Sequence, residues 1–115
     1  MTFSLYNRLY TSAQNSPDLD SYIADTGSAW DVLDYYGEDT AFLIRDLTAI
    51  WHVAHEGTRY IRSVLRMTQA EFSCTYQIPM RTVEDWDRGR RQAPAYVISL
   101  LAIASGCYQF RVGED

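Results

Sequence analysis

Residues 67–94, MTQAEFSCTYQIPMRTVEDWDRGRRQAP, decide the fold of this chain. Thr68 is a favourable N-cap, and Glu71, three residues later, completes the pattern of a capping box at a helix N-terminus. Gln77-Ile78-Pro79 then interrupts the helical pattern, because proline cannot continue a helix. The stretch therefore predicts a short helix, a tight turn, and a second helix that begins just after Pro79.

Each of the two predicted helices has one apolar face. Phe72 and Tyr76, four residues apart, point inward from the first helix, and Val83 and Trp86, three residues apart, point inward from the second. Trp86 is therefore expected to be a core residue. Gly89 suits the position just after the second helix, where a left-handed backbone is common. The outer face of the second helix then carries Met80, Arg81, Thr82, Asp85 and Arg88.

Two short helices joined by a tight turn, the second with a polar and arginine-bearing outer face, are typical of a helix-turn-helix. The stretch closely resembles the Xre/Cro family of phage-repressor-like regulators. The resemblance extends from about Thr58 to Ala104, and residues 95–104 are similar to the family's following core helix. The family's spacing is followed without a gap by Thr68-Gln69-Ala70-Glu71, Ile78, Thr82-Val83, Trp86-Asp87-Arg88-Gly89, Arg90, Arg91 and Pro94.

The chain departs from the family pattern in two ways. Gln77 lies where a glycine is common, so it must adopt a strained or altered turn geometry. The domain is C-terminal here, whereas in the family it is usually N-terminal. The role of the N-terminal half is therefore open.

The resemblance implies roles for individual residues. The second helix of a helix-turn-helix lies in the major groove, where its first residues meet base edges. The base-reading candidates are therefore Met80, Arg81, Thr82 and Asp85. Arg81 is expected to donate a bidentate pair to guanine, whereas Asp85 either repels phosphate or accepts from the amino group of cytosine. The candidates for phosphate contacts are Gln69, at the start of the first helix, and Arg88, Arg90 and Arg91, after the second.

The charge distribution is consistent with these roles. All ten basic residues are arginines, which suit bidentate contacts to phosphate and guanine. Residues 60–94 carry six arginines against four acidic residues, whereas residues 1–59 carry three arginines against nine. The net charge of the whole chain is −5. Positive charge is in excess only in residues 60–94, which include the stretch expected to bind DNA. Arg62 and Arg66 lie outside the motif and are expected to be surface residues.

The N-terminal half is also expected to be helical. Short helices are predicted over residues 4–14 and 18–24, the second after a start at Ser16-Pro17. Another is predicted to be capped by Ser28 and ended by Gly37. Trp30 and Trp51 are expected to be core or interface residues, as are most of the tyrosines.

The longest periodic segment covers residues 38–55. One helical face there is formed by Leu43, Leu47, Ile50, Trp51 and Ala54, widened by Phe42 and Ile44. A further helix is predicted over residues 59–66, with Thr58 as its N-cap. Hairpin-turn signals are absent and β-branched runs are scarce, so the fold class is all-α.

The acidic half has three interpretations. In the first, it is a packing and dimerisation region whose Leu43-to-Ala54 face is buried against a second subunit. The resemblance implies a homodimer, which would match a palindromic DNA site with half-sites about 34–36 Å apart. In the second, it docks a protein partner, as in many antitoxins. In the third, it belongs to a mobile-element (counter-defence) protein and inhibits a nucleic-acid-binding enzyme by presenting DNA-like charge. Partner binding would depend on Asp18, Asp20, Asp31 and Asp34.

Other chemistry is not indicated. His52 and His55 are three residues apart, but no third and fourth ligands accompany them, so no metal site and no cofactor are predicted. Cys74 and Cys107 are expected to be free thiols. The chain has no nucleophile–base arrangement and no phosphate-binding glycine loop, so it is not expected to be an enzyme.

The sequence thus predicts a lambda-repressor-like helix-turn-helix bundle preceded by an acidic helical extension. Residues 1–56 form the acidic region, residues 57–106 the DNA-binding domain, and residues 107–115 a tail. The expected function is that of a sequence-specific regulator of transcription that binds double-stranded DNA, as a dimeric repressor. No apolar run long enough for a transmembrane helix and no secretory signal are present, so a cytoplasmic location is expected.

Overall fold

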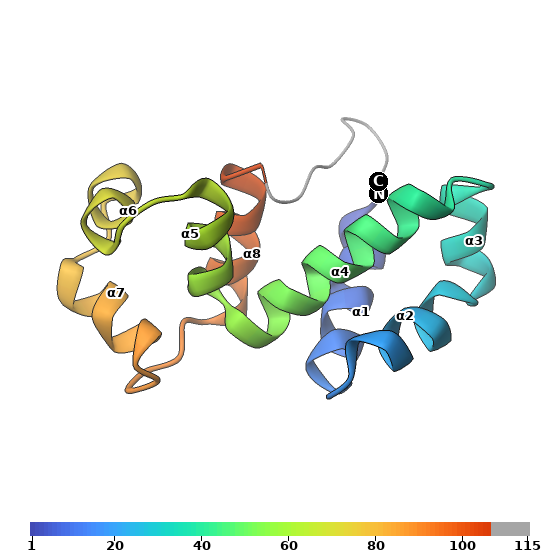
Figure 1. Ribbon diagram of the computed structural model, residues 1–115, viewed down its shortest axis with the longest axis horizontal. Coiled ribbons are helices and arrows are strands. Elements are labelled where there is room, and N and C mark those ends of the chain that lie inside the picture. The colour runs from blue at the N-terminus through green and yellow to red at the C-terminus, as the bar shows by residue number, and fades with distance from the viewer. Residues whose placement is uncertain (107–115) are drawn as a thin grey trace. The chain divides into compact units, whose positions relative to one another are not determined.

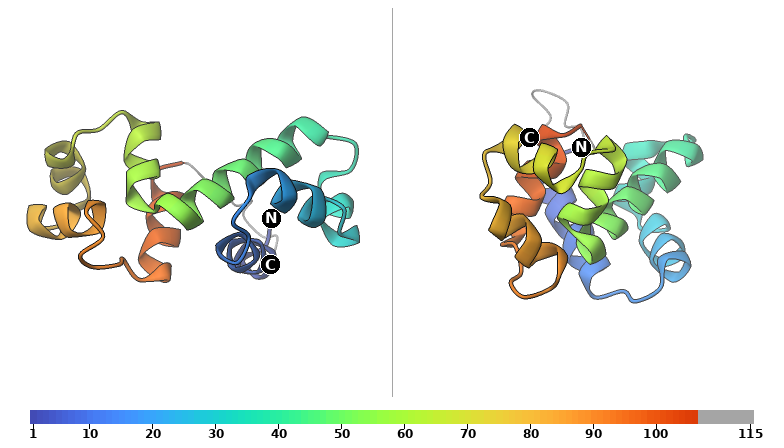
Figure 2. Two further views of the ribbon diagram at one scale, coloured as in Figure 1. Left: turned by 60° about the horizontal axis from the view of Figure 1, so that its bottom comes forward. Right: turned by 60° about the vertical axis from the view of Figure 1, so that its left-hand side comes forward.

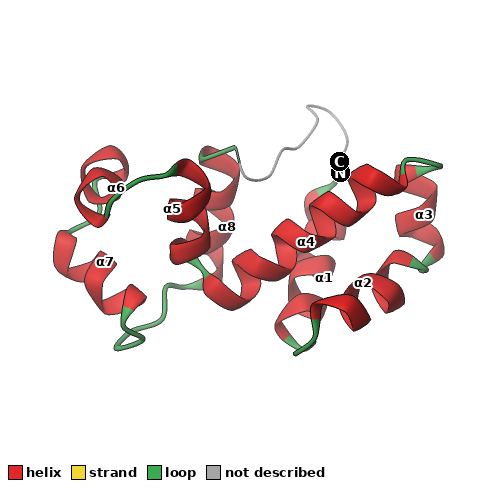
Figure 3. Cartoon of the chain, viewed as in Figure 1, coloured by secondary structure: helices red, strands yellow, loops and turns green. Residues whose placement is uncertain are grey.

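The computed structural model describes residues 1–106, and this part of the chain is helical without strands (Figure 3). The predicted all-α class is therefore confirmed there. The tail and Cys107 lie outside the described residues. The helices are α1 (Phe3–Gln14), α2 (Leu19–Gly27), α3 (Trp30–Tyr36), α4 (Thr40–Glu56), α5 (Thr58–Leu65), α6 (Gln69–Tyr76), α7 (Met80–Asp87) and α8 (Ala95–Ala104).

The described chain divides into two compact units, one from Met1 to His55 and one that begins at Glu56. The first unit contains α1 to α3 and almost all of α4, coloured blue to green in Figure 1. The second contains α5 to α8, coloured yellow-green to red. None of the described helices is both long and apolar enough to span a membrane.

In the first unit, two helices begin differently from the prediction. Asp18, not Ser16, is the N-cap of α2, and its carboxylate accepts from the Ser21 N–H at 2.9 Å. Ser16 instead donates its hydroxyl to the carbonyl of Ser12, at the end of α1. Ser28 was likewise expected to cap α3, but α3 begins after Ala29 without a side-chain cap. A serine hydroxyl can accept from a following N–H group as a helix cap, or it can donate to a preceding carbonyl. A single serine therefore does not define where a helix begins.

The core of the first unit forms where α1, α2 and α4 meet. The buried hydroxyl of Tyr22 donates to the carbonyl of Leu9 at 2.8 Å, which ties α2 to α1. Gly27 lets α4 approach α2, since a Cβ there would lie only 3.2 Å from the Leu43 side chain. The buried apolar residues of α1 to α3 include Tyr6, Leu9, Tyr10, Ala13, Tyr22 and Val32.

One interpretation of the sequence placed the α4 face against a second subunit, and the burial of this face within its own chain contradicts it. Leu43, Leu47 and Ile50 are buried within the chain itself, the first two beside Gly27. Phe42 and Ile44, expected to widen that face, are about half exposed at 48% and 45%. The apolar stripe of α4 therefore serves the core of its own unit.

The second unit begins with a correction at its first helix. Gly57, with φ of 60°, is the N-cap of α5, and Thr58 is the buried first residue of the helix instead of its cap. α5 contacts α7 and α8, and α6 contacts α7. The views in Figure 2 likewise show α6 and α7 next to each other. The buried apolar side chains are Ile61, Phe72, Val83, Ile98, Leu101 and Ala102.

The segment from α6 to α7 follows the sequence pattern closely. The predicted capping box is present, because Thr68 Oγ1 accepts from the Glu71 N–H and Glu71 Oε1 accepts from the Thr68 N–H, both at 3.1 Å. Gln77 ends α6 with φ of 56° and ψ of 42°, which confirms the strained turn. α7 begins after Pro79, and Gly89 follows it with φ of 72°.

Candidate nucleic-acid interface

α7 has one anchored face and one outer face. Val83 is 1% exposed and fixes the inner face against the rest of the unit. At 100° per residue, Arg81, Asp85 and Arg88 lie on the opposite side of the helix. The helix contacts α5 and α6, so these neighbours determine the orientation of the outer face.

The base-reading candidates differ in accessibility. Arg81 is exposed, Met80 is 39% exposed, and Thr82 is half-buried. Among the described residues, no carboxylate forms an ion pair with Arg81 or Arg88. These two guanidinium groups, seven residues apart on one face, are therefore free to meet anionic or acceptor groups.

Asp85 is more enclosed than its position on the helix suggests, with a side chain only 13% exposed. The loop after α7 folds back over it, and the carbonyl of Asp85 accepts from the N–H of Arg90 at 2.9 Å and of Arg91 at 3.4 Å. Both arginine side chains remain largely exposed. The structure thus brings Asp85 together with two of the phosphate candidates.

Gln69 belongs to a polar network that sequence reasoning missed. Its side-chain amide donates to Asp87 Oδ2 at 2.7 Å, and Arg62 Nη2 contacts the same oxygen at 2.5 Å. Arg62, expected to be a surface residue, has a side chain only 24% exposed. Asp87 follows Val83 by four residues and so shares its inner face, which is the signal that could have revealed it.

This network joins three helices of the second unit. Arg62 comes from α5, Gln69 from the first turn of α6, and Asp87 from the last residue of α7. Asp87 is only 9% exposed, so its charge is largely removed from water and depends on these donors. The contacts fix the C-terminal end of α7 and, through it, the direction of Arg81 and Arg88.

Trp86 was expected in the core, and it is half-buried at the base of α7. Cys74 is an exposed free thiol on α6. Neither residue lies on the outer face that carries Arg81 and Arg88.

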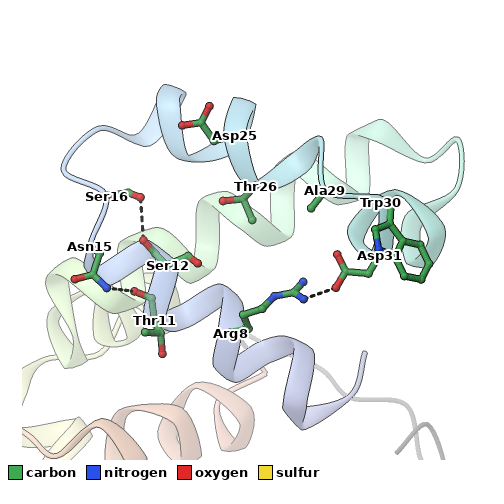
Figure 4. Close-up of a pocket in the computed structure, with 10 residues that line it drawn as sticks. All are labelled: Arg8, Thr11, Ser12, Asn15, Ser16, Asp25, Thr26, Ala29, Trp30 and Asp31. Carbon is green, nitrogen blue, oxygen red and sulfur yellow. Dashed lines mark hydrogen bonds and ion pairs between the residues drawn. The ribbon is translucent and has the colours of Figure 1, made fainter.

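The first unit has a polar groove of about 640 Å³ between α1 and the segment from α2 to α3 (Figure 4). Arg8 and Asp31 form an ion pair across it, and the hydrogen-bonded guanidinium lowers the pKa of Asp31. Trp30 lies at one end and is 78% exposed, so of the two roles expected for it, core or interface, the structure excludes the core. The other lining residues are Thr11, Ser12, Asn15, Ser16, Asp25, Thr26 and Ala29.

The two histidines take part in packing and hydrogen bonding. His55 Nε2 lies 2.7 Å from the carbonyl of Ala13, and its ring stacks on Trp51 with 4.2 Å between centroids. Trp51 in turn donates to the carbonyl of Ser16 at 2.9 Å. In the described part of the chain, no three His, Cys, Asp or Glu side chains are grouped as metal ligands.

Comparisons of the chain with protein-family models, with curated proteins and with solved structures found no match. The function is therefore inferred from the residues and geometry of this chain alone.

Proposed function

We propose that the second unit is a helix-turn-helix domain of the lambda-repressor type and that the protein is a sequence-specific regulator of transcription that binds double-stranded DNA. The observation that carries this proposal is the construction of α7. Its inner face is fixed by Val83 and Asp87, while Arg81 and Arg88 project from its outer face without a carboxylate partner in the described chain. A rigid helix with free guanidinium groups on one face suits entry into the major groove.

In this proposal the residues divide into two groups. Arg81 reads guanine through a bidentate pair, and Met80 and Thr82 meet neighbouring base edges. Arg88, Arg90 and Arg91 contact phosphates from the end of α7 and the loop that follows. Gln69 contributes from the first turn of α6, and its bond to Asp87 holds that turn in register with α7.

The experiment is in vitro selection from random duplex DNA at near-physiological salt, with wild type, Arg81→Ala and Arg59→Ala in parallel. Arg59 is an exposed arginine of α5 outside the motif and serves as the matched control. We expect wild type and Arg59→Ala to enrich the same sequence and Arg81→Ala to lose the enrichment. No enrichment by wild type would reject the proposed function.

We further propose that this regulator is a homodimeric repressor. The α4 face is buried in its own unit, so the second copy must approach elsewhere. α8 has no charged side chain and leaves Tyr96 and Leu100 exposed at 69% and 59%. Two copies with a net charge of −5 each can meet along this helix without burying a charge. Tyr96 and Leu100, four residues apart, lie on one face of α8, and a contiguous exposed apolar patch is typical of an interaction surface.

A second candidate function, in a different class, is supported by Trp30. An aromatic side chain 78% exposed beside a polar groove is suited to anchor a partner protein, and the surrounding unit is strongly acidic. We propose that such a partner presents a basic surface, as the target of an antitoxin or of a mobile-element (counter-defence) inhibitor would.

The structure refines the test of this second candidate. Asp18 caps α2 and Asp31 pairs with Arg8, so charge reversal at either would damage the fold. Asp20 and Asp34 are exposed, so Asp20→Arg and Asp34→Arg, with Trp30→Ala, are the informative variants. Loss of function in these variants, with Arg81→Ala unaffected, would favour partner binding over DNA binding.

A further inference from the structure

Each carboxylate oxygen of Asp85 lies at long ion-pair distance from one of the two arginines, Arg90 and Arg91, that follow α7. Oδ1 lies 3.9 Å from Arg90 Nη1, and Oδ2 lies 3.9 Å from Arg91 Nε. The arginine side chains are 64% and 77% exposed, whereas that of Asp85 is 13% exposed. The largely buried carboxylate thus lies within ion-pair range of two guanidinium groups that themselves face solvent.

The shape of the loop does not depend on that carboxylate. The backbone carbonyl of Asp85 accepts from the N–H groups of both arginines, and Gly89 supplies the positive φ that turns the chain. An asparagine at position 85 would retain the carbonyl and the loop. The charge of Asp85 can therefore be removed without removing the structure around it.

A carboxylate offers a guanidinium group much the same anionic acceptor as a phosphate does. Arg90 and Arg91 are the residues to which the proposed function assigns phosphate contacts. We propose that Asp85 is an internal competitor of DNA phosphate, which weakens binding to noncognate duplex and thereby raises sequence specificity. This inference rests on the proposed DNA-binding function.

The loss of the contacts between Asp85 and the two arginines affects binding to cognate and noncognate duplexes differently. When Arg90 and Arg91 exchange the carboxylate for phosphate, Asp85 is left near the groove with an unpaired negative charge. A base pair that presents an amino donor there, cytosine N4 or adenine N6, restores a hydrogen bond. A base pair without that donor leaves the charge unpaired beside the phosphates, so the wrong sequence is penalised.

The test compares Asp85→Asn with Glu84→Gln by fluorescence anisotropy on random-sequence duplex and on the duplex that wild type selects. Both substitutions remove one negative charge from α7, but in the described chain no ion pair joins Glu84 to an arginine. We expect Asp85→Asn to tighten binding to random duplex about two- to fivefold relative to Glu84→Gln, the range that one exposed ion pair supports. Discrimination between the two duplexes should fall.

A double-mutant cycle separates competition from general repulsion. In the Arg90→Gln, Arg91→Gln background, the advantage of Asp85→Asn over Glu84→Gln should disappear. Its persistence there would overturn the proposal, as would equal effects of the two substitutions in the wild-type background. Thermal unfolding confirms that the compared variants are folded.

The outcomes also distinguish failure of the proposed DNA-binding function from failure of the role proposed for Asp85. If wild type binds neither duplex, the proposed function fails, and the role of Asp85 fails with it. If wild type binds but the two variants behave alike, only the role of Asp85 is overturned.

Discussion

Gln77 occupies the left-handed region of the backbone at the end of α6. This conformation costs an L-residue about 1–2 kcal/mol, whereas glycine adopts it readily. It allows the Ile78 N–H to reach the carbonyl of Ser73 at 3.0 Å, which closes the turn before Pro79. The turn between α6 and α7 therefore holds strain that a single substitution can release.

We expect Gln77→Gly to raise the free energy of unfolding by up to about 1 kcal/mol, because relief of strain exceeds the added entropy of the unfolded chain. Chemical denaturation at constant pH measures the change. Gln92→Gly is the control, since Gln92 is exposed and its φ is not positive. Equal or lower stability of Gln77→Gly would contradict the strain argument.

Single positions show what local sequence signals can and cannot predict. The strain at Gln77 follows from its place at the turn between a capped helix and a proline, all within the twelve residues from Thr68 to Pro79. The exposure of Trp30 was not predictable in this way, because it depends on how α1 and α3 approach each other. The pairing of Asp87 with Arg62, 25 residues away in the chain, likewise depends on how the helices pack, although the spacing of Asp87 from Val83 indicates that it faces inward.

At the scale of helices, the capping box of α6 makes stability depend on pH. The hydrogen bond from the Thr68 N–H lowers the pKa of Glu71. Bonds from the Ser21 backbone and from Arg8 lower those of Asp18 and Asp31 in the same way. A carboxyl with a lowered pKa in the folded state adds stability above its unfolded pKa and loses that contribution as pH falls through its folded pKa.

The protein should therefore lose stability progressively below about pH 4, near the ordinary pKa of these side chains. Glu71→Gln keeps an acceptor for the Thr68 N–H but cannot titrate, so its unfolding midpoint should depend less on pH in this range. The measurement is thermal unfolding between neutral and acidic pH. Parallel curves for wild type and Glu71→Gln would show that this cap contributes nothing to the acid dependence.

The Asp87 network is a polar link that joins three helices of the second unit, α5, α6 and α7. Asp87→Ala leaves the guanidinium of Arg62 without its carboxylate and releases the Gln69 amide. We expect a loss of about 2–3 kcal/mol, less than the 3–5 typical of a fully buried pair, since 24% of the Arg62 side chain is exposed.

Urea denaturation tests this, with exposed Asp20→Ala as the control. The double variant Arg62→Met, Asp87→Leu should regain much of the loss, because Arg62 Nε and Asp87 Oδ1 are buried without a hydrogen-bond partner in the described structure. A loss below about 1 kcal/mol in Asp87→Ala would mean that apolar packing alone orients α7.

Helix starts were predictable where two residues reinforce each other. The side chains of Thr68 and Glu71 each accept from the backbone N–H of the other, so together they define one helix start. Ser16, Ser28 and Thr58 carry the capping signal singly, and the chain starts each helix at a neighbouring residue instead. The existence of the helices could thus be predicted throughout, whereas their first residues matched the prediction only in α6, α7 and α8.

At the scale of the whole molecule, the proposed homodimer depends on α8. Leu100→Asp places a charge on the only helix of the second unit that has none, so the dimer should dissociate into single chains. Sedimentation equilibrium over a range of concentrations measures this. Leu33→Asp, at a similarly exposed leucine of the first unit, should leave the dimer intact. A monomeric wild type, or dissociation by Leu33→Asp alone, would reject this interface.

The sequence has an acidic N-terminal half and an excess of arginine in residues 60–94. These two regions correspond to the two compact units of the structure. The assignment of the apolar stripe on α4 to a partner was wrong for a physical reason. Periodicity shows that a helix buries one face, but it does not say whether the covering surface belongs to the same chain. Here α2 supplies that surface through Gly27.

The stacking of His55 on Trp51 gives the protein an internal optical reporter. Contact with a histidine ring quenches indole emission, so the fluorescence of Trp51 should brighten when unfolding separates the two stacked rings. Trp86 lies in the other unit without such a partner among the described residues. With Trp30 and Trp86 replaced by phenylalanine, the emission of Trp51 alone would therefore follow the melting of the first unit, without a dye or label.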